Sequence, residues 1–232
     1  MKTIVIISDN HGYPARAMAP ATAAETLVIC PHDKPQAHAR PVRLPDEWLP
    51  TTDMPYGKKC WWRCELMFAA AVQQLELDAD FFWCVEADVC ARPEVWQRLM
   101  AASETRALDG IYTNLGPRLG DTGWAGWWDH PGTPSWASKR HLGAMFRLSR
   151  RAMGWLAESA VECREAFCEI ANASVVSRAG GSTGDLQQLG WFYNSHTMRP
   201  APHPCYPNKE LFNHPMKSNT EEPQEDVVIQ GV

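Results

Sequence analysis

Residues 81–89, Phe-Phe-Trp-Cys-Val-Glu-Ala-Asp-Val, constrain the fold more than any other part of the sequence. Five successive apolar residues are the pattern of a β-strand that is buried on both faces. Glu86 and Asp88 follow at the carboxyl end of this strand, which is the edge where open α/β sheets bind ligands. Two carboxylates separated by a single residue can bind Mn²⁺ or Mg²⁺, which in turn holds a diphosphate. The segment therefore predicts an α/β fold with a metal-assisted nucleotide site.

Length and charge narrow the class of protein. The chain has 232 residues and a formal net charge of −5, so we expect one domain over residues 1–217 and an acidic, flexible tail over residues 218–232. A negative net charge does not attract nucleic acid or anionic lipid electrostatically. We find no apolar run of the ~20 residues that a membrane span needs, and no signal peptide at the N-terminus. These features predict a cytoplasmic protein.

Hydrophobic patterning predicts alternating strands and helices. We expect strands at residues 3–8, 26–30, 81–85, 108–113 and 143–148, and helices at residues 58–77, 93–102, 150–159, 163–173 and 185–189. The intervening segments 31–57 and 114–141 are rich in proline, or in glycine and tryptophan, and are expected to be irregular. Alternating elements of this kind predict a single Rossmann-like domain with a mostly parallel central sheet flanked by helices.

Eight cysteines include no Cys-x-x-Cys pair. Without a secretory signal, disulfides are not expected. Cys60 and Cys64 are four residues apart on an expected helix, a spacing that a zinc site can use, but no second pair has ligand spacing. Buried free thiols are the favoured interpretation, and a zinc site is the alternative.

The turn after the first strand, Asp9-Asn10-His11-Gly12, admits two interpretations. It is similar to the opening Asp-x-His metal motif of calcineurin-like metallophosphoesterases, although the later Gly-Asn-His and Gly-His-x-His segments of that family are missing from the sequence. Alternatively, the turn lies over the crevice where doubly wound sheets bind nucleotides. On that second interpretation Ser8 and Asn10 are expected to contact a nucleotide.

Glu86-Ala87-Asp88, after an aromatic-rich strand and before a helix with an early proline, resembles the Asp-x-Asp region of nucleotide-sugar glycosyltransferases with the GT-A fold. The resemblance implies a divalent metal ion, Mn²⁺ or Mg²⁺, and a nucleotide-diphosphate sugar as donor. It implies Asp88 as the direct metal ligand. Glu86 departs from the family pattern, and for it the resemblance implies a contact with the ribose or a role through water. A helix cap or a solvated turn is the structural alternative for the pair.

Other short segments fit the same resemblance. Lys59 and Arg63 belong to the helix before the acidic strand, where such enzymes carry basic residues that face the nucleotide; solvated basic residues are the alternative. His214 and Lys217, near the C-terminus, are implied as a further metal ligand and as a phosphate contact. Residues 143–151 resemble the strand that lines the sugar pocket, with Ser149 capping the next helix.

Asp185 follows a glycine-containing loop late in the chain, where inverting GT-A enzymes carry the base that deprotonates the acceptor hydroxyl. A helix N-cap is its structural alternative. The acceptor stays open between a glycan, a protein side chain and a hydroxymethylated DNA base, and exposed tryptophans of residues 114–141 offer stacking faces. The basic residues between Lys139 and Arg151 either contact phosphates or are solvated. A non-catalytic nucleotide- or glycan-binding module is the remaining alternative to an enzyme.

Overall fold

A computed structural model describes residues 1–9, 25–87, 89, 93–117, 132–187, 193–194 and 212–213. The strands are β1 (Thr3–Ser8), β2 (Glu25–Pro31), β3 (Arg40–Val42), β4 (Phe81–Glu86), β5 (Gly110–Pro117), β6 (Lys139–Ser149), β7 (Thr183–Asp185), β8 (Tyr193–Asn194) and β9 (Phe212–Asn213). The helices are α1 (Tyr56–Trp62), α2 (Cys64–Gln74), α3 (Pro93–Glu104), α5 (Arg150–Glu158) and α6 (Cys168–Arg178), with a 3₁₀ turn, η2 (Asp46–Trp48).

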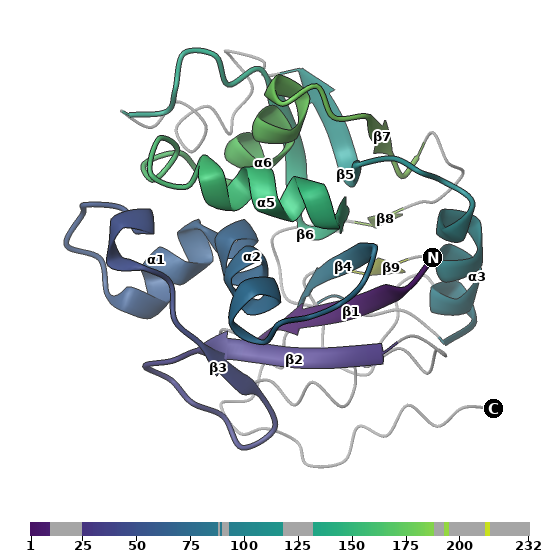
Figure 1. Cartoon of the computed structure of the whole chain (residues 1–232), viewed down its shortest axis with the longest axis horizontal. Coiled ribbons are helices and arrows are strands. Elements are labelled where there is room, and N and C mark those ends of the chain that lie inside the picture. The colour runs from purple at the N-terminus through teal and green to yellow at the C-terminus, as the bar shows by residue number, and fades with distance from the viewer. Residues whose placement is uncertain are drawn as a thin grey trace.

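Seven strands form one sheet in the order β3-β2-β1-β4-β6-β5-β7. β1 pairs in parallel with both β2 and β4, β3 is parallel to β2, and β7 is parallel to β5. β6 is antiparallel to its neighbours β4 and β5. The sheet is therefore mostly parallel, and the expected α/β class with helices around a central sheet is confirmed (Figure 1).

Alternating side chains of the central strands pack on opposite faces of the sheet. Ile4, Ile6 and Phe82 belong to a buried cluster that also contains apolar residues of α2, α5 and α6. Val5 and Trp83 belong to a second cluster, which contains the apolar face of α3. Both faces of the sheet are thus covered, with α2, α5 and α6 gathered on one side and α3 on the other (Figure 1). This is why the strand at 81–85 has apolar residues at every position.

Several boundaries differ from the sequence-based expectation. The helix expected at residues 58–77 is two helices, because Arg63 has φ −117° and ψ 45° and interrupts the helical backbone. The segment 31–57 contains β3 and η2. β6 begins at Lys139, four residues before the expected start, and the helix expected at 163–173 is α6 at 168–178. Residues 183–185 are a strand, where a helix start was expected at 185.

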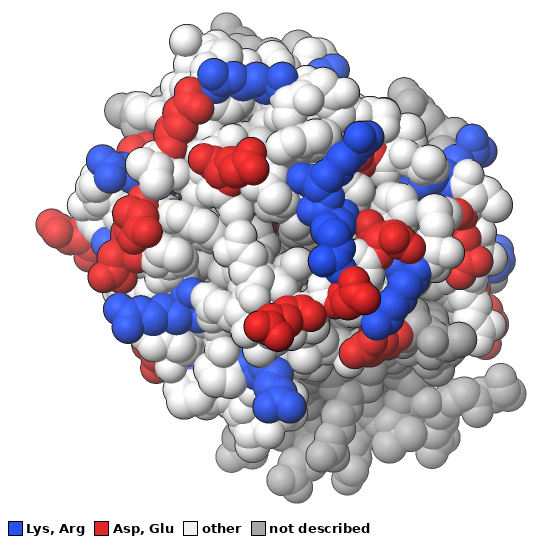
Figure 2. All heavy atoms as spheres, viewed as in Figure 1, with Lys and Arg blue, Asp and Glu red and all other residues white. Residues whose placement is uncertain are grey.

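Two further findings concern the distribution of surface charge and the absence of a membrane-spanning helix among the described residues. Positive and negative side chains are interspersed on the face shown in Figure 2, which agrees with the modest net charge. Among the residues that the structure describes, no helix combines the length and the apolar character that crossing a membrane requires.

Candidate functional site at the carboxyl edge of the sheet

The order of the strands reverses direction at β1. From β1 the chain first builds outward to β2 and β3, and β4 then pairs with the opposite side of β1. Ligands of open α/β sheets bind in the crevice beyond the carboxyl ends of the strands at such a switch point. A ligand site is therefore expected at the carboxyl ends of β1 and β4.

Ser8 and Glu86 are direct partners across this switch point. They are the last residues of β1 and β4, and the parallel register pairs them with each other. The pairing extends one residue beyond β4, since the Ala87 amide donates to the Ser8 carbonyl at 3.0 Å. Ser8 is buried, and Glu86 is partly exposed at the end of its strand. Two sequence-predicted site residues from distant segments thus lie side by side at the expected edge.

Asp9 and His38 form a pair at the same edge that the sequence did not predict. The Asp9 carboxylate is fully buried, and its Oδ2 atom is 3.0 Å from Nε2 of His38, whose side chain is about one-third exposed. The Asp9 amide donates to the Ile29 carbonyl of β2 at 2.8 Å. His38 belongs to the proline-rich segment 31–57, which has no periodicity, so no sequence pattern indicated this contact.

Four of the six other residues proposed for the metal and nucleotide site lie outside the described residues. Asn10, Asp88, His214 and Lys217 lie outside the described residues, as does His11 of the alternative metallophosphoesterase motif. Lys59 lies on α1 and is partly exposed. The structure therefore brings together Ser8 and Glu86, whereas the metal ligands stay predictions.

The structure corrects the expectation for Arg63. Its guanidinium is 1% exposed and forms an ion pair with Glu65, with 2.6 Å between Nη2 and Oε1. A second Arg63 nitrogen, Nη1, donates to the Cys163 carbonyl. The same side chain that interrupts the helix thus bonds inside the protein, because a buried carboxylate requires a cation beside it. It is not a phosphate contact in this structure.

Asp185 ends β7 and lies opposite Tyr112 of β5. Its Oδ2 atom accepts a hydrogen bond from the Leu115 amide at 2.5 Å, and its Oδ1 atom accepts one from the Gln187 amide at 2.7 Å. The residue is 6% exposed. The carboxylate therefore has a structural role at the end of a strand, in place of the expected helix N-cap. Its role as a catalytic base stays a prediction.

The basic residues of β6 and α5 separate to opposite edges of the sheet. Lys139 and Arg140 begin β6, which is antiparallel to β4, and so lie toward the carboxyl edge. Arg147 is buried and donates to the carbonyls of Ser103, Arg106 and Leu108. Arg150 and Arg151 follow at the other edge, where they pair with Asp78 and Asp109. These arginines bind protein groups and do not form one phosphate-binding surface.

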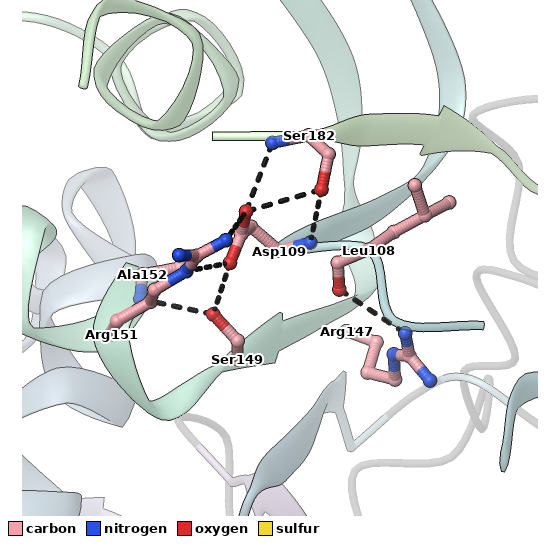
Figure 3. A network of polar contacts seen from close by, with 7 residues as sticks. All are labelled: Leu108, Asp109, Arg147, Ser149, Arg151, Ala152 and Ser182. Atoms are coloured by element: carbon pink, nitrogen blue, oxygen red, sulfur yellow. Dashed lines mark hydrogen bonds and ion pairs between the residues drawn. The ribbon is translucent and has the colours of Figure 1, made fainter. Parts of the chain in front are cut away.

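Asp109 organises the edge opposite the candidate site (Figure 3). Its carboxylate accepts hydrogen bonds from Ser149 Oγ at 2.9 Å, from the Ser182 amide at 2.9 Å and from Arg151. Ser149 Oγ also accepts from the Ala152 amide at 3.2 Å, which confirms it as the N-cap of α5. Stability contacts thus gather at one edge of the sheet, and the expected ligand-binding edge is the other.

Trp136 is the one tryptophan of the segment 114–141 among the described residues. Its Nε1 atom donates to Glu162 at 2.7 Å, and the Arg178 guanidinium lies 4.2 Å from the centre of its ring. This ring is engaged by protein groups. The other three tryptophans of the segment lie outside the described residues.

Comparisons with known proteins add little to this geometry. No family model matches the sequence, and no curated protein matches it. Among solved structures, the fold is similar to that of CMP:2-keto-3-deoxy-manno-octonic acid synthetase complexed with CTP. The TM-score is 0.43 and the sequence identity is 11%, and the match covers 80% of this chain and 89% of that one. A likeness this distant supports no conclusion about activity.

Proposed function

We propose that this protein is a metal-dependent glycosyltransferase of GT-A type, which moves a sugar from a nucleotide-diphosphate sugar to a hydroxyl acceptor. One observation carries the proposal: Ser8 and Glu86 are register partners at the carboxyl ends of β1 and β4, where the strand order reverses. That position is the general ligand-binding crevice of open α/β sheets. Glu86 therefore lies at this edge of the sheet, and Asp88 follows it two positions later in the sequence.

Each residue of the proposed metal and nucleotide site would have a role in binding the nucleotide-diphosphate sugar. Asp88 and His214 would hold Mn²⁺ or Mg²⁺, whose oxygen and imidazole ligands they supply. When bound, the ion supplies Lewis-acid stabilisation of charge on the departing diphosphate. Ser8, Asn10 and Glu86 would contact the nucleoside, and Lys59 and Lys217 the phosphates.

Asp185 is proposed as the acceptor base only if transfer inverts the sugar's configuration. Its two backbone hydrogen bonds fix the carboxylate, and they leave lone pairs on both oxygens for a further donor. Asp185→Asn keeps the size of the side chain and removes the base. We expect this variant to lose transfer while it keeps donor binding; if transfer is retained, the base assignment is wrong.

The test of the proposed function is turnover of nucleotide-diphosphate sugars with Mn²⁺ present or chelated. We expect nucleotide release from one nucleotide class by the wild type. Asp88→Ala should lower the rate roughly 100-fold or more, since a metal ion contributes several kcal/mol to charge stabilisation. Asp78→Ala is the matched control, because Asp78 is an exposed carboxylate whose side chain is 94% accessible.

Two results would contradict the proposal. One is turnover that is unaffected by chelation, or equal in the wild type and Asp88→Ala. The other is metal-dependent binding of a nucleotide sugar without any turnover or transfer, which would favour the alternative of a non-catalytic binding module.

A further inference from the structure

A second cluster of possible ligands lies inside the protein, where helices α2 and α6 begin. Cys64 is the first residue of α2 and Cys168 is the first residue of α6. Both belong to a small apolar cluster with Trp62, Phe167 and Ile170, and they are 0% and 4% exposed. The two sulfur atoms lie within 4.8 Å of each other although the residues are 104 positions apart in the sequence. Glu65 follows Cys64 and is fully buried beside them.

The potential ligand atoms of these three residues are close enough to share one ion. The sulfur atoms of Cys64 and Cys168 and a carboxylate oxygen of Glu65 all lie within 4.8 Å of one another. Zinc bonds to sulfur at about 2.3 Å and to carboxylate oxygen at about 2.0–2.2 Å. Ligands of a tetrahedral ion are therefore roughly 3.3–3.8 Å apart. A small inward movement of the side chains would bring these atoms to that spacing.

Glu65 supplies a second, independent observation that favours a bound cation. Its Oε1 atom accepts from Arg63, with 2.8 Å to Nε and 2.6 Å to Nη2. Its Oε2 atom is buried and has no hydrogen bond of normal geometry within the part of the chain that the structure describes; besides Arg63, the backbone amides of Glu65 and Leu66 lie near the carboxylate. A buried carboxylate oxygen without a partner is unfavourable and requires an explanation. A cation bound beside the two thiols would provide that partner.

Charge also favours a divalent ion. Arg63 already balances the carboxylate of Glu65, so two thiolates and one divalent ion would add no net charge to the interior. Because cysteine binds zinc as the thiolate, binding of the ion to two thiols would release two protons.

We propose that Cys64, Glu65 and Cys168 bind a zinc ion that joins the N-terminal ends of α2 and α6. Two thiolates and one carboxylate suit zinc, and soft sulfur ligands disfavour Mn²⁺ and Mg²⁺. Water would complete a tetrahedral site. The zinc ion would be structural, and it is separate from the ion proposed at the edge of the sheet. Cys60, the spacing partner of Cys64 in the sequence, is not a ligand.

Cobalt substitution tests the site directly, because Co²⁺ bound to thiolates has a sulfur-to-metal charge-transfer band that Co²⁺ on oxygen ligands lacks. Titration of the reduced protein with Co²⁺ should produce this band at about one equivalent, and Zn²⁺ should abolish it. We expect Cys64→Ser and Cys168→Ser each to weaken Co²⁺ binding at least tenfold. Cys60→Ser and Cys163→Ser are matched controls, since both thiols are buried and outside the trio.

A measurement on the wild-type protein tests the site without any variant, and therefore does not depend on whether the variants fold. Zinc added to the reduced protein in weak buffer should release about two protons per ion bound. The proposal is overturned by a missing charge-transfer band, by release of no protons, or by a band that survives both ligand substitutions. It is also overturned if Cys64 and Cys168 are found as a disulfide that excludes metal.

Discussion

At the scale of single residues, Asp109 shows how one buried carboxylate can join three strands. It precedes β5, and its partners Ser149 and Ser182 end β6 and precede β7. Burial raises the pKa of Asp109, but the hydrogen bonds from Arg151, Ser182 and Ser149 outweigh that effect and lower the pKa to about 2. The ionised form is therefore the one that the folded protein favours.

The depressed pKa of Asp109 predicts a pH-dependent contribution to stability. The contribution is fully present above the unfolded value of 3.8 and is lost as the pH falls through about 2. We expect Asp109→Asn to lower the free energy of unfolding by about 2 kcal/mol at neutral pH, with a smaller difference from the wild type toward pH 2. Urea unfolding at a series of pH values measures both quantities.

Asp78→Asn is the control for this prediction. Asp78 is also paired with an arginine, Arg150, but its side chain is 94% exposed, so the pair should contribute less than about 1 kcal/mol. An equal loss of stability in the two variants, or a loss in Asp109→Asn that does not change with pH, would show that the Asp109 network has no special role.

Single residues are also where sequence reasoning about the site was weakest. Ser8 and Glu86 could be placed because strand ends in a parallel sheet share an edge. The interior pairing of Arg63 could not be predicted, since its burial depends on a carboxylate two positions later and on a carbonyl 100 positions later. The Asp9–His38 pair likewise depends on the path of an aperiodic segment.

At the scale of elements, Gly110 permits close packing at the start of β5. A Cβ atom there would lie 2.4 Å from the ring of Tyr112, two residues along the same face. Tyr112 is fully buried, and its hydroxyl donates to Asn172 of α6 at 3.1 Å. The ring therefore cannot move without breaking the contact between β5 and α6.

We predict that Gly110→Ala lowers the free energy of unfolding by about 1–3 kcal/mol, the usual cost of overpacking a core. Gly154→Ala is the matched control, because a Cβ atom at this position of α5 would meet nothing within 4 Å. That change should stabilise the protein by roughly 0.5–1 kcal/mol through helix propensity. Thermal or urea unfolding of both variants checks the prediction, and a stable Gly110→Ala protein would contradict it.

Elements with strong local signals were predictable. The strand at residues 3–8 was found with both boundaries, and Ser149 caps its helix as its residue type indicated. β7 was missed because Asp185 favours a helix cap locally, whereas pairing with β5 determines its conformation. The break between α1 and α2 was missed because the apolar period continues through Arg63, whose non-helical backbone coincides with a buried ion pair to Glu65.

At the scale of the whole molecule, the proposed binding site and the Asp109 network lie at opposite edges of the sheet. The edge with Ser8 and Glu86 lies at the reversal of strand order, and the Asp109 network holds the opposite edge. Alternation of strands and helices predicted a mostly parallel sheet. It could not predict that β6 inserts antiparallel between β4 and β5, because strand order depends on long-range packing.

The central claim is that the carboxyl edge of β1 and β4 binds a nucleoside diphosphate together with a divalent metal ion. Isothermal titration of uridine, guanosine, cytidine, adenosine and thymidine diphosphates, each with and without Mn²⁺, tests it most directly. We predict that one nucleotide binds only with Mn²⁺, that Asp88→Ala abolishes binding, and that Glu86→Gln weakens it roughly tenfold. Asp78→Ala should bind like the wild type. Binding that needs no metal, that survives both edge substitutions, or that no nucleotide shows would contradict the claim.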